Sequence, residues 1–188
     1  MNMTIYFIGH LPPPINGFSS INFRIKELLE KVTDVKVFDN SKSIISVCFF
    51  FTKMLFLRKP NSMYLALSGG LRQFFDILFI FYSRIFRIKL FIHHHSFSYL
   101  NNFNIVTFFI LFLSKNSNHI FLCEEMASLI SRNYKLKIKN YDILSNSAFI
   151  DKVTSKNNID INTINPLRIG YISNISEEKG IYDFINII

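Results

Sequence analysis

Residues 4–19 read Thr-Ile-Tyr-Phe-Ile-Gly-His-Leu-Pro-Pro-Pro-Ile-Asn-Gly-Phe-Ser, an apolar run followed by a turn rich in proline and glycine. The run Thr4–Ile8 predicts a buried β-strand. Three prolines stiffen the chain after this strand, and Gly17 allows the backbone to approach a ligand closely. Ser19 or Ser20 is the predicted N-cap of the helix that follows. A strand, a stiff loop and a helix in this order are typical of the first unit of a parallel α/β sheet.

The same alternation continues along the chain, where further apolar runs predict strands that are separated by helices. Strands joined through helices predict a parallel, Rossmann-like α/β sheet with helices on both faces. The predicted strands are Val35–Phe38, Met63–Leu67, Leu90–His93, His119–Leu122 and Tyr141–Leu144, and the predicted helices are Ile44–Leu57, Leu71–Phe86, Phe103–Leu113 and Glu124–Asn133.

The composition of the chain changes after residue 150. Residues 151–166 are polar and have no apolar period, which predicts a linker. Leu167–Ile172 again predicts a buried strand, and a new apolar run extends from Gly180 to the last residue. We therefore expect a first domain over residues 1–150 and the start of a second Rossmann-like domain over 167–188. Because one β–α unit cannot bury both its faces, we expect the second domain to be truncated or completed by a partner.

The formal net charge of +8 is concentrated in one part of the sequence. Such a basic field attracts phosphates, nucleic acid or an anionic membrane surface. Nucleic-acid binding favours exposed aromatic side chains, whereas most phenylalanines here lie in apolar runs that we expect to be buried. We therefore expect no nucleic acid as partner and consider an anionic membrane surface instead. The basic residues are Lys42, Lys53, Arg58, Lys59, Arg72, Arg84, Arg87 and Lys89, opposed only by Asp76.

The sequence shows no signal peptide and no apolar run long enough to cross a bilayer, which favours the cytoplasm. The apolar runs are expected to form core helices, or helices that touch the inner face of the cell membrane from one side. Cys48 and Cys123 both lie in apolar runs and are expected to be buried, free thiols.

Three consecutive histidines, His93, His94 and His95, stand where the fourth predicted strand ends. Because side chains alternate along a strand, His93 and His95 share one face and His94 takes the other. Neutral imidazoles at this position could donate to a phosphate or act near a sugar. The alternative is that the backbone satisfies them within the sheet core. A metal site would need further ligands, and none stands at ligand spacing, so we expect no metal.

Four segments, in this order, resemble one family. Ile5–Ser19 resembles the opening of bacterial glycosyltransferases of the family-four type, which have the glycosyltransferase B fold. His93–Tyr99 resembles their histidine loop, and Leu144–Ser147 resembles their Pro-Asn-Gly-type segment before the interdomain linker. Ile169–Gly180 is similar to the signature Gly-Arg-Leu-Ser-x-Glu-Lys-Gly, which opens the nucleotide-sugar domain. The resemblance therefore covers the whole chain.

This resemblance implies an acceptor-binding first domain and a second domain that binds a nucleotide sugar, with no other cofactor. His95 would lie beside the reacting sugar, where it would orient the sugar or stabilise the transition state. Gly17 and Lys179 would contact the donor diphosphate, and the leaving diphosphate would be neutralised by the lysine. The remaining candidate substrate-binding residues are Asn16, His93, Ser96 and Glu178.

The implied activity is transfer of a sugar, with a uridine-diphosphate sugar as the commonest donor, to a saccharide or polyprenyl-linked acceptor in bacterial surface polysaccharide synthesis, such as O-antigen. The chain departs from the family at Ser173 and Asn174, which stand where the signature has glycine and arginine. Most of the donor domain is also missing, so we expect the 188-residue chain alone to be inactive. The alternatives are a non-catalytic basic α/β module that binds anionic membrane or nucleic acid, and another nucleotide-using enzyme of this fold, such as an epimerase.

Overall fold

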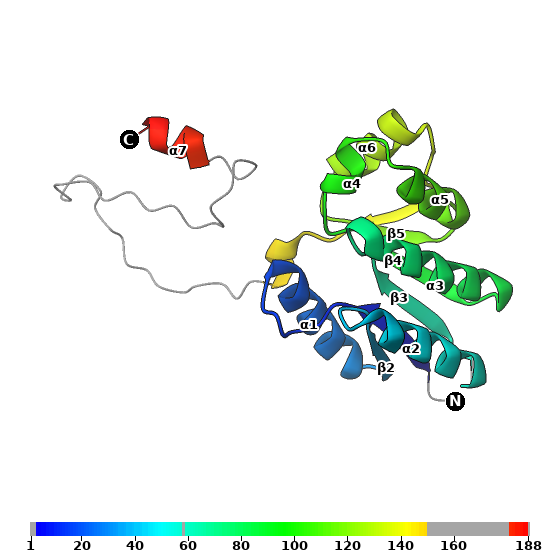
Figure 1. Cartoon of the computed structure of the whole chain (residues 1–188). Helices are drawn as coiled ribbons and strands as arrows, with labels where there is room; N and C mark the ends of the chain where they lie inside the picture. The colour runs from blue at the N-terminus through cyan, green and yellow to red at the C-terminus, as the bar shows by residue number, and fades with distance from the viewer. Residues whose placement is uncertain (1–2, 58, 150–180, 188) are drawn as a thin grey trace. The chain divides into compact units, whose positions relative to one another are not determined.

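The computed structural model describes residues 3–57, 59–149 and 181–187 of the chain (Figure 1). The chain divides into two units, Met1–Ile150 and Asp151–Ile188. The whole sheet lies in the first unit. In the second unit, the described element is α7 (Ile181–Ile187), a helix within the apolar run that begins at Gly180. The predicted linker and the predicted strand before this helix lie outside the described residues.

A six-stranded sheet forms the first unit, and every strand is parallel to its neighbours. The strand order is β2-β1-β3-β4-β5-β6. Each strand that the sequence predicts before residue 149 is present, and its bounds differ from the prediction by no more than one residue. The prediction of a parallel, Rossmann-like α/β sheet is therefore confirmed. The strands are β1 (Thr4–Gly9), β2 (Asp34–Asp39), β3 (Ser62–Ala66), β4 (Lys89–His93), β5 (Asn118–Phe121) and β6 (Asn140–Ile143).

Helices connect the strands, as predicted. Two further elements, α4 and η2, are absent from the prediction because segments of four residues are too short to show a helical period. The first two residues of the predicted helix Leu71–Phe86 belong instead to a 3₁₀ turn, η1. The α-helices of this unit are α1 (Gly17–Glu30), α2 (Ile44–Phe56), α3 (Gln73–Ile85), α4 (Ser98–Asn101), α5 (Ile105–Ser114) and α6 (Glu124–Tyr134), and the 3₁₀ turns are η1 (Gly70–Arg72) and η2 (Asn146–Phe149).

The two faces of the sheet are covered unequally. On one face, α1 packs through Ile25 against Phe7, Tyr64 and Ala66, with Phe149 of η2 beside them. The other face carries the larger core, to which α2, α3, α5 and α6 contribute. Alternation along the strands produces this division, since neighbouring residues of one strand point to opposite faces. Helices therefore lie on both faces, as expected, but most of them gather on one.

The start of α1 corrects the prediction that Ser19 or Ser20 is the N-cap. The helix begins at Gly17, and Asn16 is the N-cap with an extended backbone. Asn16 and Ser19 form a capping box, in which each side chain accepts a hydrogen bond from the backbone N–H of the other residue. Ser19 is therefore the N3 residue. Asn and Ser are both good capping residues, and the pattern alone did not show which of them holds the N-cap position.

Two expectations about burial are wrong. Cys48 is exposed and Cys123 is half-buried, although both are free thiols as predicted. Many phenylalanines of the apolar runs are also exposed, because α2, α3 and α5 carry apolar residues on their outward sides as well as on their inward sides. Among the described residues, no helix is long and apolar enough to cross a bilayer. The exposed phenylalanines are Phe23, Phe49, Phe56, Phe74, Phe81, Phe97, Phe103, Phe109 and Phe112.

Candidate functional site

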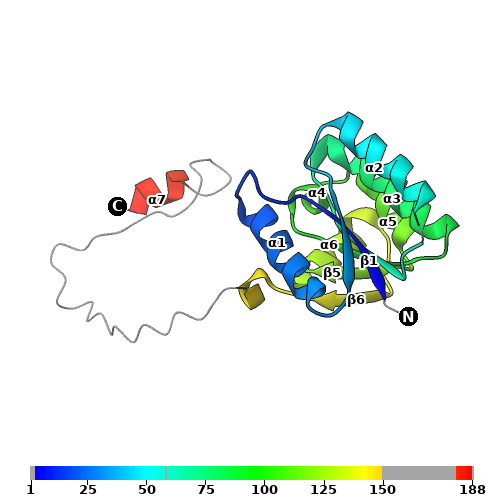
Figure 2. The ribbon, with the colours of Figure 1, turned by 90° about the horizontal axis from the view of Figure 1, so that it is seen from below.

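The chain leaves the neighbouring strands β1 and β3 toward opposite faces of the sheet (Figure 2). β1 leads into α1 on one face, whereas β3 leads through η1 into α3 on the other. Ligands of open parallel sheets bind outside the carboxyl ends of the strands at such a switch point. The loop after β4 reaches the same edge, since β4 lies next to β3. We call this edge, formed by the carboxyl ends of the strands, the carboxyl edge.

Hydrogen bonds hold the proline loop to the start of α1. Ser19 N–H donates to Asn16 Oδ1 (2.9 Å), and Asn16 N–H donates to Ser19 Oγ (3.0 Å). The Ser19 hydroxyl donates to the carbonyl oxygen of Pro14 (2.7 Å). Gly17, the first helical residue, has no heavy atom within 4 Å of the position that a Cβ would occupy. The backbone at the start of α1 is therefore open on this side, in a place suited to a phosphate.

A row of five rings crosses the carboxyl edge. His10, which follows β1, packs against Phe18 of α1 with ring centroids 5.2 Å apart. Phe18 packs edge-on against His95 at 4.8 Å, and His95 lies 3.8 Å from His93. His93 Nδ1 is 2.6 Å from the hydroxyl oxygen of Tyr64, within hydrogen-bond distance. The prediction that His93 and His95 share one face is confirmed, and the structure adds Phe18, His10 and Tyr64 to them.

The histidines of this row are neutral near pH 7. Burial, and secondarily the neighbouring His93, holds the pKa of His95 well below its ordinary value. Burial lowers the pKa of His93 to about 4. The pKa of His10 is also lowered, by burial and then by Arg72, while Asp39 acts in the opposite direction. Each ring therefore offers one N–H donor and one bare nitrogen acceptor.

Several nitrogens in the row are buried and have no hydrogen-bond partner within the protein. Both ring nitrogens of His95 are in this state, as are Nε2 of His93 and Nε2 of His10. An unsatisfied buried polar atom costs about 1–3 kcal/mol, so such atoms call for an explanation. The four nitrogens lie at the edge where ligands of parallel sheets bind, so a bound molecule would supply their missing partners once the side chains that cover them move aside.

His94 faces the other side of the sheet and forms a buried hydrogen-bonded chain. Since the carbonyl of Ser114 can only accept, His119 Nε2–H donates to it (2.9 Å). The bare Nδ1 of His119 then accepts from His94 Nε2–H (2.9 Å), and His94 Nδ1 accepts from the Tyr99 hydroxyl (3.4 Å). Burial lowers the pKa of His119 to about 4, and burial together with the neighbouring histidines holds the pKa of His94 well below its ordinary value. Both His94 and His119 are therefore core residues.

A buried carboxylic acid lies behind the carboxyl ends of β2 and β3. Asp76, in the first turn of α3, accepts from Ser68 N–H (2.8 Å) and from Ser68 Oγ–H (3.3 Å), and Asn40 Nδ2–H lies 3.5 Å away. Burial raises the pKa of Asp76 to about 7, although these hydrogen bonds and Arg72 act to lower it. The Arg72 guanidinium donates to the carbonyl oxygens of Asn40 and Lys42. Arg72 is thus a cation at the carboxyl edge, whereas the sequence indicated it only as one of the basic residues between Lys42 and Lys89.

The remaining predicted site residues differ in their surroundings. Ser96 accepts from Ser98 N–H (3.1 Å), so its side chain is engaged at the start of α4. The Asn16 side chain is likewise engaged in the cap of α1. His93 is fully buried behind His95, which makes it a positioning residue in this arrangement. The other candidates, Lys179 and Glu178, lie outside the described residues, as do Ser173 and Asn174.

Two surface hollows lie away from the ring row. One, of about 560 Å³, is bounded by Pro12 and Ile15 of the proline loop and by the outer side of α1. The other, of about 540 Å³, lies between α6 and β6. The hydroxyl of Tyr141, which lines the second hollow, donates to Glu124 Oε2 (3.1 Å). We prefer the ring row as the candidate site, because neither hollow contains a buried polar atom that lacks a partner.

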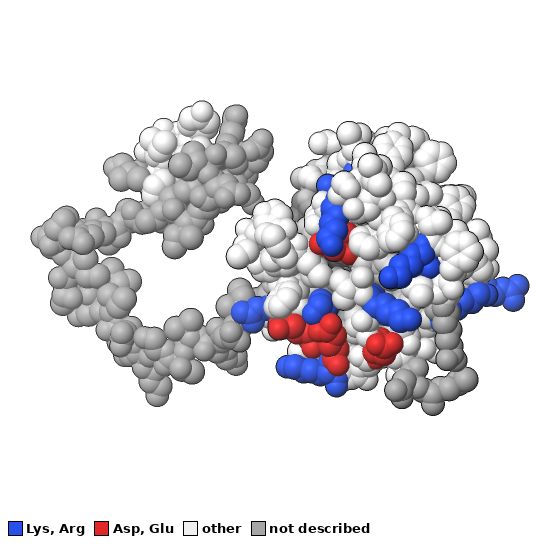
Figure 3. Space-filling view, turned by 60° about the horizontal axis from the view of Figure 1, so that its bottom comes forward, with Lys and Arg blue, Asp and Glu red and all other residues white. Residues whose placement is uncertain are grey.

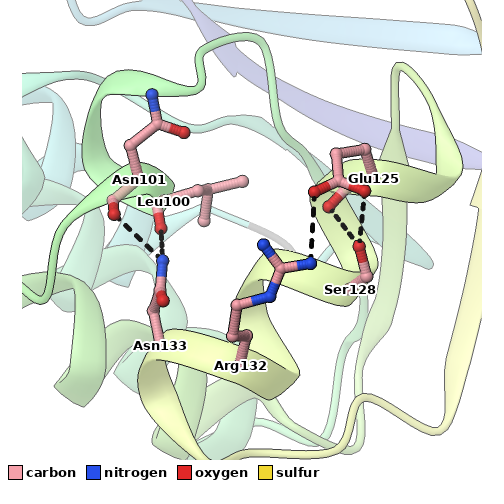
Figure 4. A network of polar contacts seen from close by, with 6 residues as sticks. All are labelled: Leu100, Asn101, Glu125, Ser128, Arg132 and Asn133. Carbon is pink, nitrogen blue, oxygen red and sulfur yellow. Dashed lines mark hydrogen bonds and ion pairs between the residues drawn. The ribbon is translucent and has the colours of Figure 1, made fainter.

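Polar contacts of α6 support the loop that follows the histidines (Figure 4). Asn133 Nδ2–H donates to the carbonyl oxygens of Leu100 (2.7 Å) and Asn101 (3.0 Å), which ties α6 to α4. On the neighbouring turns of α6, Glu125 forms an ion pair with Arg132 (3.6 Å). Among the described residues, no group of three or more His, Cys, Asp or Glu side chains is arranged to hold a metal ion.

The comparisons with known proteins do not assign a family. No protein-family model and no curated protein matches the sequence. The arrangement at the carboxyl edge therefore has to be interpreted from its own chemistry.

Proposed function

We propose that the chain is part of a glycosyltransferase, with residues 1–150 as the acceptor-binding domain of a glycosyltransferase B fold and residues 167–188 as the start of the donor domain. The donor would be a nucleotide sugar, such as a uridine-diphosphate sugar, and the acceptor a saccharide, which in surface polysaccharide synthesis is carried on a polyprenyl lipid. Support comes from the order of the motifs along the chain and from the Rossmann-like sheet.

The observation that carries this proposal is the environment of His95. Its ring is neutral, both its nitrogens lack partners, and it packs against Phe18 at the start of α1. A substrate hydroxyl beside His95 would find one acceptor and one donor held in place by the ring row. The diphosphate would lie at the N-terminus of α1 over Gly17, where backbone N–H groups favour negative charge.

The proposed reaction forms a bond between the acceptor hydroxyl oxygen and the anomeric carbon of the donor. The bond from that carbon to the diphosphate oxygen breaks, and its electron pair leaves with the nucleoside diphosphate. The hydroxyl proton passes to a base or to solvent. His95 would orient the sugar and stabilise charge in the transition state, while Lys179 would neutralise the leaving diphosphate.

The test is turnover of a panel of nucleotide sugars with a polyprenyl-linked acceptor, using the 188-residue chain and any in-frame continuation beyond Ile188. In the form that shows turnover, His95→Ala should lower kcat/KM by about 100-fold or more with the fold intact by circular dichroism. Phe97→Ala is the matched control, since Phe97 is an exposed residue of the same loop outside the ring row. Full activity in His95→Ala would remove His95 from its role.

A second candidate function is a non-catalytic module that binds an anionic partner. It is favoured by the surface between residues 42 and 123, where the only acidic residue, Asp76, is fully buried. The turnover assay distinguishes the two functions, since a module of this kind would bind its partner without turning over any nucleotide sugar. An epimerase of the same fold would instead change the donor sugar in the absence of an acceptor.

A further inference from the structure

The outward sides of α2, α3 and α5 form one broad exposed apolar surface, which we call the apolar face. α3 lies between α2 and α5 and contacts both (Figures 1 and 2). Ile45 and Phe49 are 81% and 65% exposed on α2, and Leu71, just before α3, is 82% exposed. The remaining large apolar residues of the face are Ile44, Leu55 and Phe56 on α2, Phe74, Leu78, Phe81 and Ile85 on α3, and Phe103, Ile105, Phe109 and Phe112 on or beside α5.

The exposed charges of the segment that forms the apolar face are all of one sign. The chain from residue 42 to residue 123 contains a single acidic residue, Asp76, and that side chain is fully buried. Lysines border the face and lie over its rings or over rings next to it. Lys42 lies 5.7 Å from the Phe50 ring, and Lys115 lies 5.0 Å from the Phe112 ring. In Figure 3, the acidic side chains lie toward the left and in the lower middle of the domain, and its right-hand part carries Lys and Arg among uncharged side chains.

We propose that the apolar face docks on an anionic lipid bilayer, with its large apolar side chains in the headgroup and acyl boundary and its lysines at the anionic headgroups. Exposed apolar surfaces of this extent mark interaction sites in proteins that do not aggregate. Helices that lie in the bilayer interface combine an apolar side with basic residues at its border. This inference is independent of sugar transfer, since it rests on a different surface of the domain.

Charge complementarity distinguishes the bilayer from two other occupants. In a symmetric dimer through this face, Lys42, Lys53 and Lys115 of the two copies would approach one another without an exposed acidic residue of this surface to pair with, which is unfavourable. Single-stranded nucleic acid binds by stacking its bases on aromatic rings. A large share of the apolar face is aliphatic, such as Ile45, Leu71 and Ile85, and those side chains offer no ring for stacking.

The chain contains no tryptophan, so a single introduced tryptophan reports on one position alone. We expect Phe49→Trp and Phe81→Trp to show a blue shift of emission on mixing with vesicles of equal parts phosphatidylglycerol and phosphatidylcholine. Phe23→Trp is the matched control, since Phe23 is also an exposed helical phenylalanine but lies on α1, on the other side of the sheet. It should show no shift. Equal shifts at all three positions, or none at Phe49 and Phe81, would overturn the proposal.

Flotation with the same vesicles measures the contribution of charge. Lys53→Gln should weaken binding about fivefold, which corresponds to ~1 kcal/mol for one basic residue near an anionic leaflet. Lys31→Gln, at an exposed lysine that ends α1, should leave binding unchanged. High salt and pure phosphatidylcholine should also weaken flotation. Failure of the unmodified chain to float on anionic vesicles would contradict the proposal.

Two other partners of the apolar face, a second copy of the chain and nucleic acid, would give different experimental results. If a second copy covers the face, ultracentrifugation will show a dimer that Phe49→Asn converts to monomer, and vesicles will not bind. If nucleic acid is the partner, an oligonucleotide will bind to the unmodified chain and not to Phe49→Asn. Neither neutral nor anionic vesicles will displace the oligonucleotide. Either result would replace the bilayer as the occupant of the apolar face.

Discussion

The ring of His95 packs edge-on against the ring of Phe18, with their centroids 4.8 Å apart. This contact joins the loop after β4 to the first turn of α1, two segments that are far apart in sequence. Because Ser19 fixes the same turn to the proline loop, the position of His95 depends on the cap of α1 as well as on its own strand.

Substitution of alanine for two glycines, Gly9 and Gly17, should change the free energy of unfolding in different ways. A Cβ at Gly9 would lie 3.0 Å from Cβ of Ala66, where β1 and β3 end side by side, whereas a Cβ at Gly17 would meet nothing within 4 Å. We expect Gly9→Ala to lower the free energy of unfolding by about 1–3 kcal/mol, measured by urea denaturation. Gly17→Ala should be neutral or raise it by up to about 1 kcal/mol. Equal effects would mean that the described packing around Gly9 is wrong.

The capping box predicts a specific role for one of two adjacent serines. Ser19→Ala removes the acceptor for Asn16 N–H and the donor to the Pro14 carbonyl. We expect a loss of about 1–2 kcal/mol in the free energy of unfolding. Ser20→Ala should change it by less than about 0.5 kcal/mol, as expected for a residue outside the cap. A larger loss at Ser20 would restore the sequence-based N-cap and contradict the structure.

The buried chain through His94 fixes the tautomers of two histidines. His119 must carry its proton on Nε2, because that atom donates to the Ser114 carbonyl, and His94 must then also carry its proton on Nε2. Long-range ¹H–¹⁵N correlation spectra should show a protonated Nε2 and a bare Nδ1 for both rings at neutral pH. A protonated Nδ1 on His119 is incompatible with the described hydrogen bonds.

The depressed histidine pKa values predict that acid destabilises the fold. Burial lowers the pKa of His93 and His119 from 6.5 to about 4. Between pH 6.5 and about 4, the unfolded chain therefore binds protons that the folded chain does not. The stability contribution of each neutral ring is fully present above pH 6.5 and declines as the pH falls, by about 1.4 kcal/mol per pH unit and histidine. Urea denaturation at a series of pH values measures this decline.

Asp76 provides the control, because its titration changes the free energy of unfolding with pH in the opposite direction. Its pKa is raised from 3.8 to about 7, so its contribution is fully present below pH 3.8 and is lost as the pH rises through 7. Asp76→Asn removes this contribution, and the decline on acidification from pH 7 to pH 4 should steepen by about 1.4 kcal/mol per unit. An unchanged slope would show that Asp76 is not the buried acid described.

The two cysteines should react with a maleimide at very different rates. Cys48 is exposed on α2 and Cys123 is half-buried after β5, so Cys48 should be labelled first. Mass spectrometry after digestion identifies the labelled peptide, and Cys48→Ser provides the control. Anionic vesicles should slow the labelling of Cys48, which lies among the exposed residues of α2, and leave that of Cys123 unchanged.

The strands and the division of the histidines between two faces could be predicted because both depend on local patterns. Apolar runs of four to six residues and strict alternation place β4 and separate His93 from His94. The contact of Phe18 with His95 and the position of Arg72 beside His10 could not be predicted, since they depend on how α1 and η1 pack after the sheet has formed. The prediction that Phe49 and Cys48 are buried was wrong. An apolar helix is normally covered on all sides, but α2 carries apolar residues on its outward side as well.

The position of Leu71 beside Arg72 has a further consequence for how a substrate would arrive. Leu71 belongs to the apolar face, and Arg72 lies at the carboxyl edge near His10. If the face lies on a bilayer as proposed, the carboxyl edge at Arg72 borders the lipid, while the ring row lies on the α1 side of the sheet. A lipid-borne acceptor would then reach the carboxyl edge by lateral diffusion, in a two-dimensional search, and its effective concentration would depend on the membrane area rather than on the volume of the cell.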